Sequence, residues 1–125
     1  MQTVVITGAT SGIGLATTKK FLQNGWQVML VARNATKGAQ VVADLTQDFD
    51  EKLIGFVAAD VSKEADTKEM AKATLKRFGG IDALVNDAGI VVHGKVHEIS
   101  ADDWARVFDI NVKGSYLAAK AVLPT

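Results

Sequence analysis

Three glycines near the N-terminus have the spacing of a phosphate-binding loop. They lie in the run Thr7-Gly8-Ala9-Thr10-Ser11-Gly12-Ile13-Gly14, between an apolar segment and a helical pattern. Between a strand and a helix, glycines allow a tight turn, a close approach of pyrophosphate to the backbone, and close packing of the helix on the strand. The N–H groups at the helix start then face the phosphates. A glycine-rich turn without a ligand is the alternative, but the strand-loop-helix context favours dinucleotide binding.

The residues after the second apolar segment indicate which dinucleotide is bound. Such folds contact the adenosine ribose about 20 residues after the glycine loop, where an acid favours NAD and an arginine accommodates the 2′-phosphate of NADP. Here the sequence is Val31-Ala32-Arg33-Asn34, and no acidic residue lies between Gly14 and Asp44. We therefore expect NADP, with NAD as the weaker candidate. A solvated surface arginine is the alternative reading of Arg33.

Strand-like and helix-like segments alternate along the whole chain. We expect strands at residues 3–7, 27–31, 53–59 and 81–85, with amphipathic helices between them. This alternation predicts an α/β fold with three layers, in which helices cover both faces of a parallel sheet. We expect about four strands in the order 3-2-1-4, in one dinucleotide-binding domain over residues 1–125 that stops before a fifth strand. Ligands of such sheets bind beyond the carboxyl ends of the strands.

The apolar spacing also predicts which face of each helix is buried. For the first helix the predicted inner residues are Ile13, Ala16, Thr17 and Phe21. A single last helix is expected to start near Ser100, which can cap it, and to stop at Pro124. Its predicted inner stripe is Trp104, Val107, Phe108, Asn111, Ser115, Ala118 and Val122. Trp26 and Trp104 are expected in the core or at an interface.

Composition narrows the function classes. The 125 residues carry 14 basic and 14 acidic side chains, so a net charge of zero gives no electrostatic case for nucleic acid or an anionic membrane. The absence of cysteine excludes thiol chemistry, and no apolar run has the length of a membrane span. His93 and His97 lack a third ligand, so no metal site is expected. A cytoplasmic location follows as an expectation, since no signal peptide is evident.

Four motifs together resemble the N-terminal, cofactor-binding half of the short-chain dehydrogenases/reductases, whose fold is Rossmann-like. They are the glycine run, Asp60-Val61, Asn86-Asp87-Ala88-Gly89 and Asn111-Val112-Lys113-Gly114. The resemblance implies an NAD(P)-dependent oxidoreductase that transfers hydride between a carbonyl and an alcohol, with Asn111 in its catalytic set. The implied cofactor-binding residues are Gly8, Thr10, Ser11, Gly12, Ile13, Gly14, Arg33, Asn34, Asp60, Val61, Asn86, Ala88 and Gly89. Asp87 departs from the family motif, which has a second asparagine there.

The rest of the family's catalytic set does not occur in this chain. The family uses a serine and a Tyr-x-x-x-Lys motif that come after a further strand. Tyr116-Leu117-Ala118-Ala119-Lys120 matches the motif literally, but it lies in the Asn111 helix and is read as a chance match. A non-catalytic dinucleotide-binding or self-associating half-domain is therefore the alternative function. We expect a homo-oligomer through helix 101–123 and the exposed edge of the fourth strand. The carbonyl or alcohol substrate requires the C-terminal half.

Overall fold

A computed structural model describes residues 1–88 and 100–123. For residues 104 and 107–109 it describes the backbone alone. Its elements are β1 (Thr3–Thr7), α1 (Gly12–Gln23), β2 (Gln27–Ala32), α2 (Ala35–Leu45), a short 3₁₀ turn (Glu51–Leu53), β3 (Ile54–Ala58), α3 (Glu64–Phe78), β4 (Ala83–Asn86), α4 (Ala101–Phe108), a π-helical segment (Asp109–Lys113) and α5 (Gly114–Val122). The predicted α/β class is confirmed. β1 has the predicted bounds, and the bounds of the other strands differ from the prediction by at most two residues.

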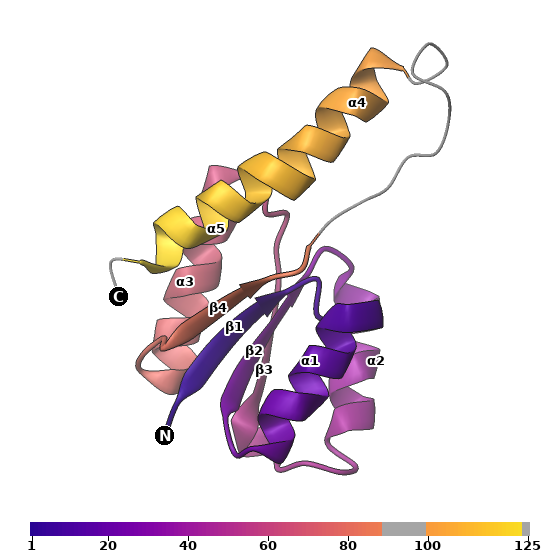
Figure 1. The fold of residues 1–125 in the computed structure, drawn as a ribbon. Helices are drawn as coiled ribbons and strands as arrows, with labels where there is room; N and C mark the ends of the chain where they lie inside the picture. Colours follow the sequence, from indigo (N-terminus) through magenta and orange to yellow (C-terminus); the bar gives the residue numbers. More distant parts are fainter. Residues whose placement is uncertain (89–99, 124–125) are drawn as a thin grey trace.

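The four strands form one parallel sheet in the order β3-β2-β1-β4, as predicted. Figure 1 shows α1 and α2 on one face of this sheet and α3 and α5 on the other. β1 is buried along its whole length, because it is a central strand covered on both faces. β4 pairs with β1 on one side, and no strand within the described ranges pairs with its other side.

Alternate residues of the strands supply two cores. Val4, Ile6 and Leu30 pack toward α1 and α2 in one cluster. Val5 and Met29 point to the opposite face and pack with residues of α3 and α5 in the second. Because successive strand side chains point to opposite faces, the continuously apolar strands fill both layers. The Rossmann-like arrangement thus follows directly from the strand sequences.

The predicted inner face of α1 is right for Phe21, which packs against the core, and wrong for Ile13 and Ala16, which are exposed. Ile13 is 75% exposed, whereas Gly14, Thr18 and Leu22 are buried. Gly14 sets this rotation, because a Cβ there would overlap the carbonyl oxygen of Gly8. Thr18 is tolerated inside because its hydroxyl donates to the Gly14 carbonyl at 2.9 Å. The apolar pattern missed a face built on a glycine and a threonine.

The predicted single last helix is interrupted by the π-helical segment (Asp109–Lys113). Ser100 does begin it, since its hydroxyl accepts from the Asp103 N–H at 3.0 Å. At the π-helical segment and the residues that follow it, the buried positions lie one residue before the predicted ones: Ile110 and Gly114 are buried, while Asn111 is exposed and Ser115 only partly covered. Further along, Ala118 and Val122 are buried as predicted. Placing Asn111 and Ser115 on the inner stripe was therefore wrong. The prediction for Trp104, Val107 and Phe108 concerns side chains outside the described part.

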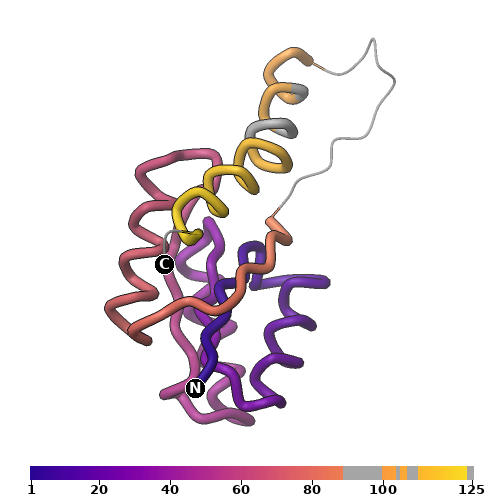
Figure 2. The backbone as a smooth tube through the Cα atoms, turned by 60° about the vertical axis from the view of Figure 1, so that its left-hand side comes forward, coloured from indigo at the N-terminus to yellow at the C-terminus, as the bar shows by residue number. Residues whose placement is uncertain are grey.

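The last helix nevertheless has a partner within this chain. Figures 1 and 2 show α5 lying beside α3, while α4 extends beyond the body of the sheet. Leu117, Ala118 and Val122 are buried in this contact, and Nζ of Lys120 lies 3.1 Å from Oε1 of Glu64.

Trp26 packs edge-on against Phe21, with ring centroids 4.9 Å apart. In the described segments, no helix combines the length and hydrophobicity needed to cross a membrane.

Candidate dinucleotide-binding site

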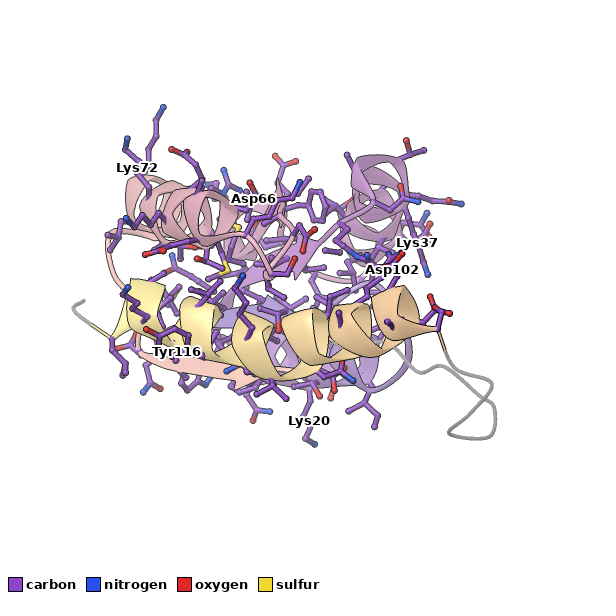
Figure 3. The ribbon with its side chains drawn as sticks, turned by 90° about the horizontal axis from the view of Figure 1, so that it is seen from above. Lys20, Lys37, Asp66, Lys72, Asp102 and Tyr116 are labelled. Carbon is purple, nitrogen blue, oxygen red and sulfur yellow. The ribbon has the colours of Figure 1, made fainter. Side chains whose placement is uncertain are left out.

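A cavity of about 310 Å³ opens beyond the carboxyl ends of the strands. Figure 3 looks at the molecule from this end, with Lys37 and Asp102 labelled on the same side of the view. Segments following all four strands contribute to the cavity. The residues that line it are Gly8, Thr10, Val31, Ala32, Arg33, Asn34, Lys37, Ala59, Val61, Ala88 and Ile110. Six of the predicted cofactor residues thus share one cavity: Gly8, Thr10, Arg33, Asn34, Val61 and Ala88.

The glycine loop requires glycine at the positions that the sequence indicated. Gly8 and Gly12 have φ values of 65° and 56°, in the left-handed region that side chains rarely adopt. A Cβ on Gly8 would lie 2.7 Å from the backbone oxygen of Asp87. Nothing lies within 4 Å of a Cβ on Gly12. Gly8 is therefore held between β1 and the segment after β4, while Gly12 serves the turn alone.

Thr7 is a positioning residue that the sequence analysis missed. Its hydroxyl oxygen accepts from the backbone N–H groups of Asp87 and Ala88, both at 3.1 Å. It also lies 3.4 Å from the Val85 carbonyl, to which it can donate. These bonds tie the end of β1 to the segment that follows β4. A hydroxyl residue directly before the first loop glycine was the available signal.

The side chain of Asp87 lies against the glycine loop. Its Oδ2 would be 2.9 Å from a Cβ placed on Gly14. The backbone bond to Thr7 is made by the N–H of Asp87, which any residue type could supply. The departure from the family's asparagine therefore leaves this connection between β1 and the segment after β4 intact.

Arg33 and Asn34 lie where β2 gives way to α2. The Asn34 side chain caps α2, since its Oδ1 accepts from the Lys37 N–H at 3.0 Å. Arg33 is exposed and lines the cavity. Lys37 stands in the first turn of α2 and lines the same cavity, although the sequence analysis did not single it out. The two cations and the N-terminus of α2 together make this wall electropositive.

Asp60 makes a local turn directly after β3 with its own side chain. Its Oδ1 accepts from the Ser62 hydroxyl at 2.6 Å and from the Ser62 N–H at 3.0 Å. Partial burial acts to raise the pKa of Asp60, but these hydrogen bonds and the charges of Arg33 and Lys63 outweigh it and lower the pKa. Asp60 is therefore an ionised carboxylate with one oxygen already occupied.

A second cavity of about 330 Å³ adjoins the first and shares Arg33 and Ile110 with it. Its other lining residues are Asp60, Ser62, Asp102, Ala105 and Arg106. The side chain of Asp60 thus borders the second cavity, while its neighbour Val61 lines the first. The residues from α4 show that this helix forms one wall.

The other predicted site residues lie outside the lining of both cavities. Ser11, Gly12, Ile13 and Gly14 turn the chain into α1, and Asn86 ends β4. Asn111 is exposed in the π-helical segment, next to the cavity residue Ile110. Gly89, His93 and His97 lie outside the described residues. In the described ranges, no three histidine or acidic side chains group as a metal site.

Tyr116 and Lys120 face away from the cavities. Tyr116 is 60% exposed on α5, and the Lys120 ammonium lies 5.9 Å from its ring centroid. Neither residue lines the cavity at the glycine loop. A hydrogen bond with Glu64, together with the charge of that carboxylate, raises the pKa of Lys120. The ion pair of Lys120 and Glu64 therefore joins α5 to α3, and it lies outside the candidate site.

The family model described as short chain dehydrogenase matches residues 2–125. An uncharacterised oxidoreductase of Staphylococcus aureus is 37% identical over 121 residues, which are 97% of this chain and 51% of that protein. The chain spans about half the length of the curated relatives it matches.

Two solved structures share the fold at comparable identity. A short-chain dehydrogenase/reductase from Burkholderia phymatum in complex with NAD is 35% identical, with a TM-score of 0.92 over 98% of this chain and 43% of that one. An alcohol dehydrogenase from Thermococcus sibiricus complexed with 5-hydroxy-NADP is 30% identical, with a TM-score of 0.90 over 99% and 52% of the two chains. The similar structures therefore include complexes with both types of dinucleotide.

The glycine loop, the sheet order and the cavity beyond the strand ends agree with the family match over nearly the whole chain. This chain belongs to the short-chain dehydrogenase family.

Proposed function

We propose that this chain is the NADP(H)-preferring, cofactor-binding half of an oxidoreductase that interconverts a carbonyl and an alcohol. One observation carries the cofactor preference: Arg33 lines the same cavity as Gly8, Thr10 and Ala88. A dinucleotide whose pyrophosphate lies at the glycine loop would extend its adenosine ribose toward Arg33. The guanidinium can donate to a 2′-phosphate there, and no acid stands at this position to accept from a 2′-hydroxyl.

The residues present fit such a cofactor. Gly8 lines the cavity with a φ of 65° and has no side chain that could come between the loop backbone and a phosphate. The carbon-lined part of the cavity, from Val31, Val61 and Ile110, suits an adenine ring. Ser11, Gly12, Ile13 and Gly14 would present backbone groups to the pyrophosphate, with Asp60, Asn86 and Gly89 as further contacts. When bound, the nicotinamide supplies or accepts the hydride.

This chain's own part in the reaction is to bind and orient the dinucleotide. Asn111 would hold a water of the proton relay, as the family resemblance implies. The residue that donates the proton would have to come from outside residues 1–125, since Tyr116 lies away from the cavity. The alternative function, a dinucleotide-binding module without turnover, shares the same site. Reduction of a panel of aldehydes and ketones with NADPH separates the two, because only the enzyme consumes the cofactor.

Binding tests the cofactor preference directly. The chain is titrated with NADPH and NADH by calorimetry, alongside Arg33→Ala. Loss of a charge-assisted hydrogen bond costs about 1.5 to 3 kcal/mol, so we expect NADPH to bind about 10- to 100-fold more weakly and NADH nearly unchanged. Asp44→Ala, near the C-terminal end of α2 and outside the lining of the cavity, is the control. Equal affinities for the two cofactors in the unmodified chain would refute the preference.

We also propose that the protein self-associates through helix 101–123 and the side of β4 that pairs with no strand in the described ranges. Val112, Tyr116 and Leu123 of this helix are 58%, 60% and 80% exposed, although all three carry large apolar or aromatic side chains. Such residues in one helix are typical of interaction surfaces. Light scattering that finds only monomer at high concentration would contradict this proposal.

The cytoplasmic location stays a prediction.

A further inference from the structure

The turn between α1 and β2 contains the one asparagine in the sequence that a glycine follows. This pair is Asn24-Gly25, whereas Asn34, Asn86 and Asn111 precede alanine, aspartate and valine. Glycine has no Cβ beside its backbone nitrogen, so this nitrogen can approach the amide carbon of the preceding side chain without hindrance. Both residues are exposed, and nothing lies within 4 Å of a Cβ placed on Gly25. The turn is therefore accessible to water and to dissolved base.

The closed turn keeps the two reacting groups of this pair apart. The Asn24 side chain is bound back onto α1, since its Nδ2 donates to the Lys20 carbonyl at 2.8 Å. The Gly25 N–H donates to the Leu22 carbonyl at 3.1 Å, which opposes the loss of its proton. The ψ angle of Asn24 is 12°, so the Gly25 nitrogen nearly eclipses the backbone nitrogen of Asn24 and is turned away from its side chain. An attack on that side chain therefore requires the turn to open.

Only a few contacts have to break for this opening. Beyond the bonds of the pair itself, the Trp26 N–H donates to the Phe21 carbonyl at 3.1 Å, and the two rings pack edge-on with centroids 4.9 Å apart. Helix ends and turns open at a lower free energy than the core of a protein. The turn can therefore open while the sheet stays folded.

We propose that Asn24 is a site of spontaneous deamidation, whose rate is set by local opening of the turn between α1 and β2. In the open turn the Gly25 nitrogen attacks Cγ of Asn24. The N–Cγ bond forms, the Cγ–Nδ2 bond breaks, and ammonia leaves with the proton of the Gly25 N–H. Water then opens the resulting succinimide at either carbonyl and gives aspartate or isoaspartate. The net reaction consumes water and releases ammonia, with no change of oxidation state.

The modification weakens the end of α1 and spares the dinucleotide cavity. A carboxylate at position 24 replaces a donor by an acceptor opposite the Lys20 carbonyl, and it puts a negative charge at the negative end of the helix dipole. Isoaspartate also lengthens the main chain by a methylene, which shifts Trp26 relative to Phe21. Figure 1 shows that α1 ends at the opposite end of the sheet from the glycine loop.

The experiment follows deamidation of the full chain by peptide mapping and mass spectrometry in mildly alkaline buffer, both folded and in unfolding concentrations of urea. In urea we expect Asn24 to react faster than Asn34, Asn86 and Asn111, because it alone precedes glycine. In the folded chain Asn24 should react about 10- to 100-fold more slowly than in urea, since its own hydrogen bond and that of Gly25 must break first. Gly25→Ala should slow the reaction in urea as well, because its Cβ hinders the attack.

Two further variants test whether the opening is local. Phe21→Leu removes the ring contact with Trp26, so it should raise the rate at Asn24 in the folded chain about 2- to 10-fold and leave the rate in urea unchanged. Phe78→Leu, at the end of α3 on the other face of the sheet, is the matched control and should leave both rates unchanged. Hydrogen exchange of the Trp26 N–H, measured by NMR, should rise together with the rate of deamidation.

Each alternative result overturns a stated part of the proposal. If Asn24 reacts no faster than the other asparagines in urea, the site itself is refuted. If Asn24 reacts equally fast in the folded chain and in urea, the turn does not control the rate. Equal acceleration by Phe21→Leu and Phe78→Leu would show that the reaction proceeds through global unfolding, which contradicts local opening.

Discussion

Replacement of Gly14 by alanine tests the packing that positions the glycine loop. A Cβ there would overlap the Gly8 carbonyl oxygen and lie 2.7 Å from its carbon, whereas ordinary contacts begin at 3.4 Å. The nearest neighbours of this Cβ include backbone atoms, which cannot turn aside as a flexible side chain can. The helix α1 must therefore move away from β1 by at least about 0.7 Å, the difference between 3.4 Å and 2.7 Å. The loop is closely packed on its other side as well, since a Cβ on Gly8 would lie within 3 Å of the backbone of Asp87 and Ala88.

The expected cost follows from these contacts. Overpacking a rigid core costs about 1 to 3 kcal/mol, and the better helix propensity of alanine offsets about 1 kcal/mol at most. We therefore expect Gly14→Ala to lower the free energy of unfolding by about 1 to 2 kcal/mol in urea denaturation. Cofactor affinity should fall as well, because the displaced helix start carries the phosphate-binding N–H groups.

Gly25→Ala is the matched control for this experiment. Gly25 has a φ of 79° and nothing within 4 Å of a Cβ, and it lies at the end of α1 away from the cavity. Its substitution should cost about 1 kcal/mol of backbone strain and leave cofactor affinity unchanged. If Gly14→Ala proves as stable as the unmodified chain and binds the cofactor equally well, the reasoning about the loop is refuted.

Three further predictions concern residues around the site. Thr7→Val should lower the free energy of unfolding by about 2 kcal/mol in urea, because two backbone N–H groups lose their acceptor, while Thr7→Ser should not. For Asp60, a pKa lowered from 3.8 stabilises the fold above that pH, and the effect is lost as the pH falls through the folded pKa. Asp60→Asn should therefore flatten the acid limb of a stability–pH profile, and an unchanged limb would contradict the shift. Tyr116→Phe should leave NADPH affinity unchanged in calorimetry, because Tyr116 lies outside the cavity. A selective loss would mean that this residue reaches the cofactor.

The sheet was predictable because its strands are unambiguous. The strands are uninterrupted apolar runs, with residues such as Val4, Val5 and Leu30. Because these runs alternate with helices along the chain, they predict a parallel sheet covered on both faces. The glycine loop was predictable because the turn and the close packing of Gly8 and Gly14 admit few other residues.

Helix rotations and polar connections were harder to predict. The inner face of α1 depends on Gly14 and Thr18, which carry no hydrophobic signal. Near the π-helical segment the buried positions are Ile110 and Gly114 in place of Asn111 and Ser115, and a regular helical period cannot anticipate this local change. Lys37 was missed because its place in the cavity depends on the start of α2, which only the folded chain defines.

An amide ¹⁵N–¹H spectrum recorded during titration with NADP⁺ tests the central claim most directly. The account predicts that the largest shifts occur around the first cavity, at Gly8, Thr10, Arg33, Val61 and Ala88. Amides at the opposite end of the strands, where Thr46 and Arg77 line a separate cavity, should not move. Shifts concentrated at that opposite end, or a spectrum unchanged at saturating NADP⁺, would contradict dinucleotide binding at the glycine loop.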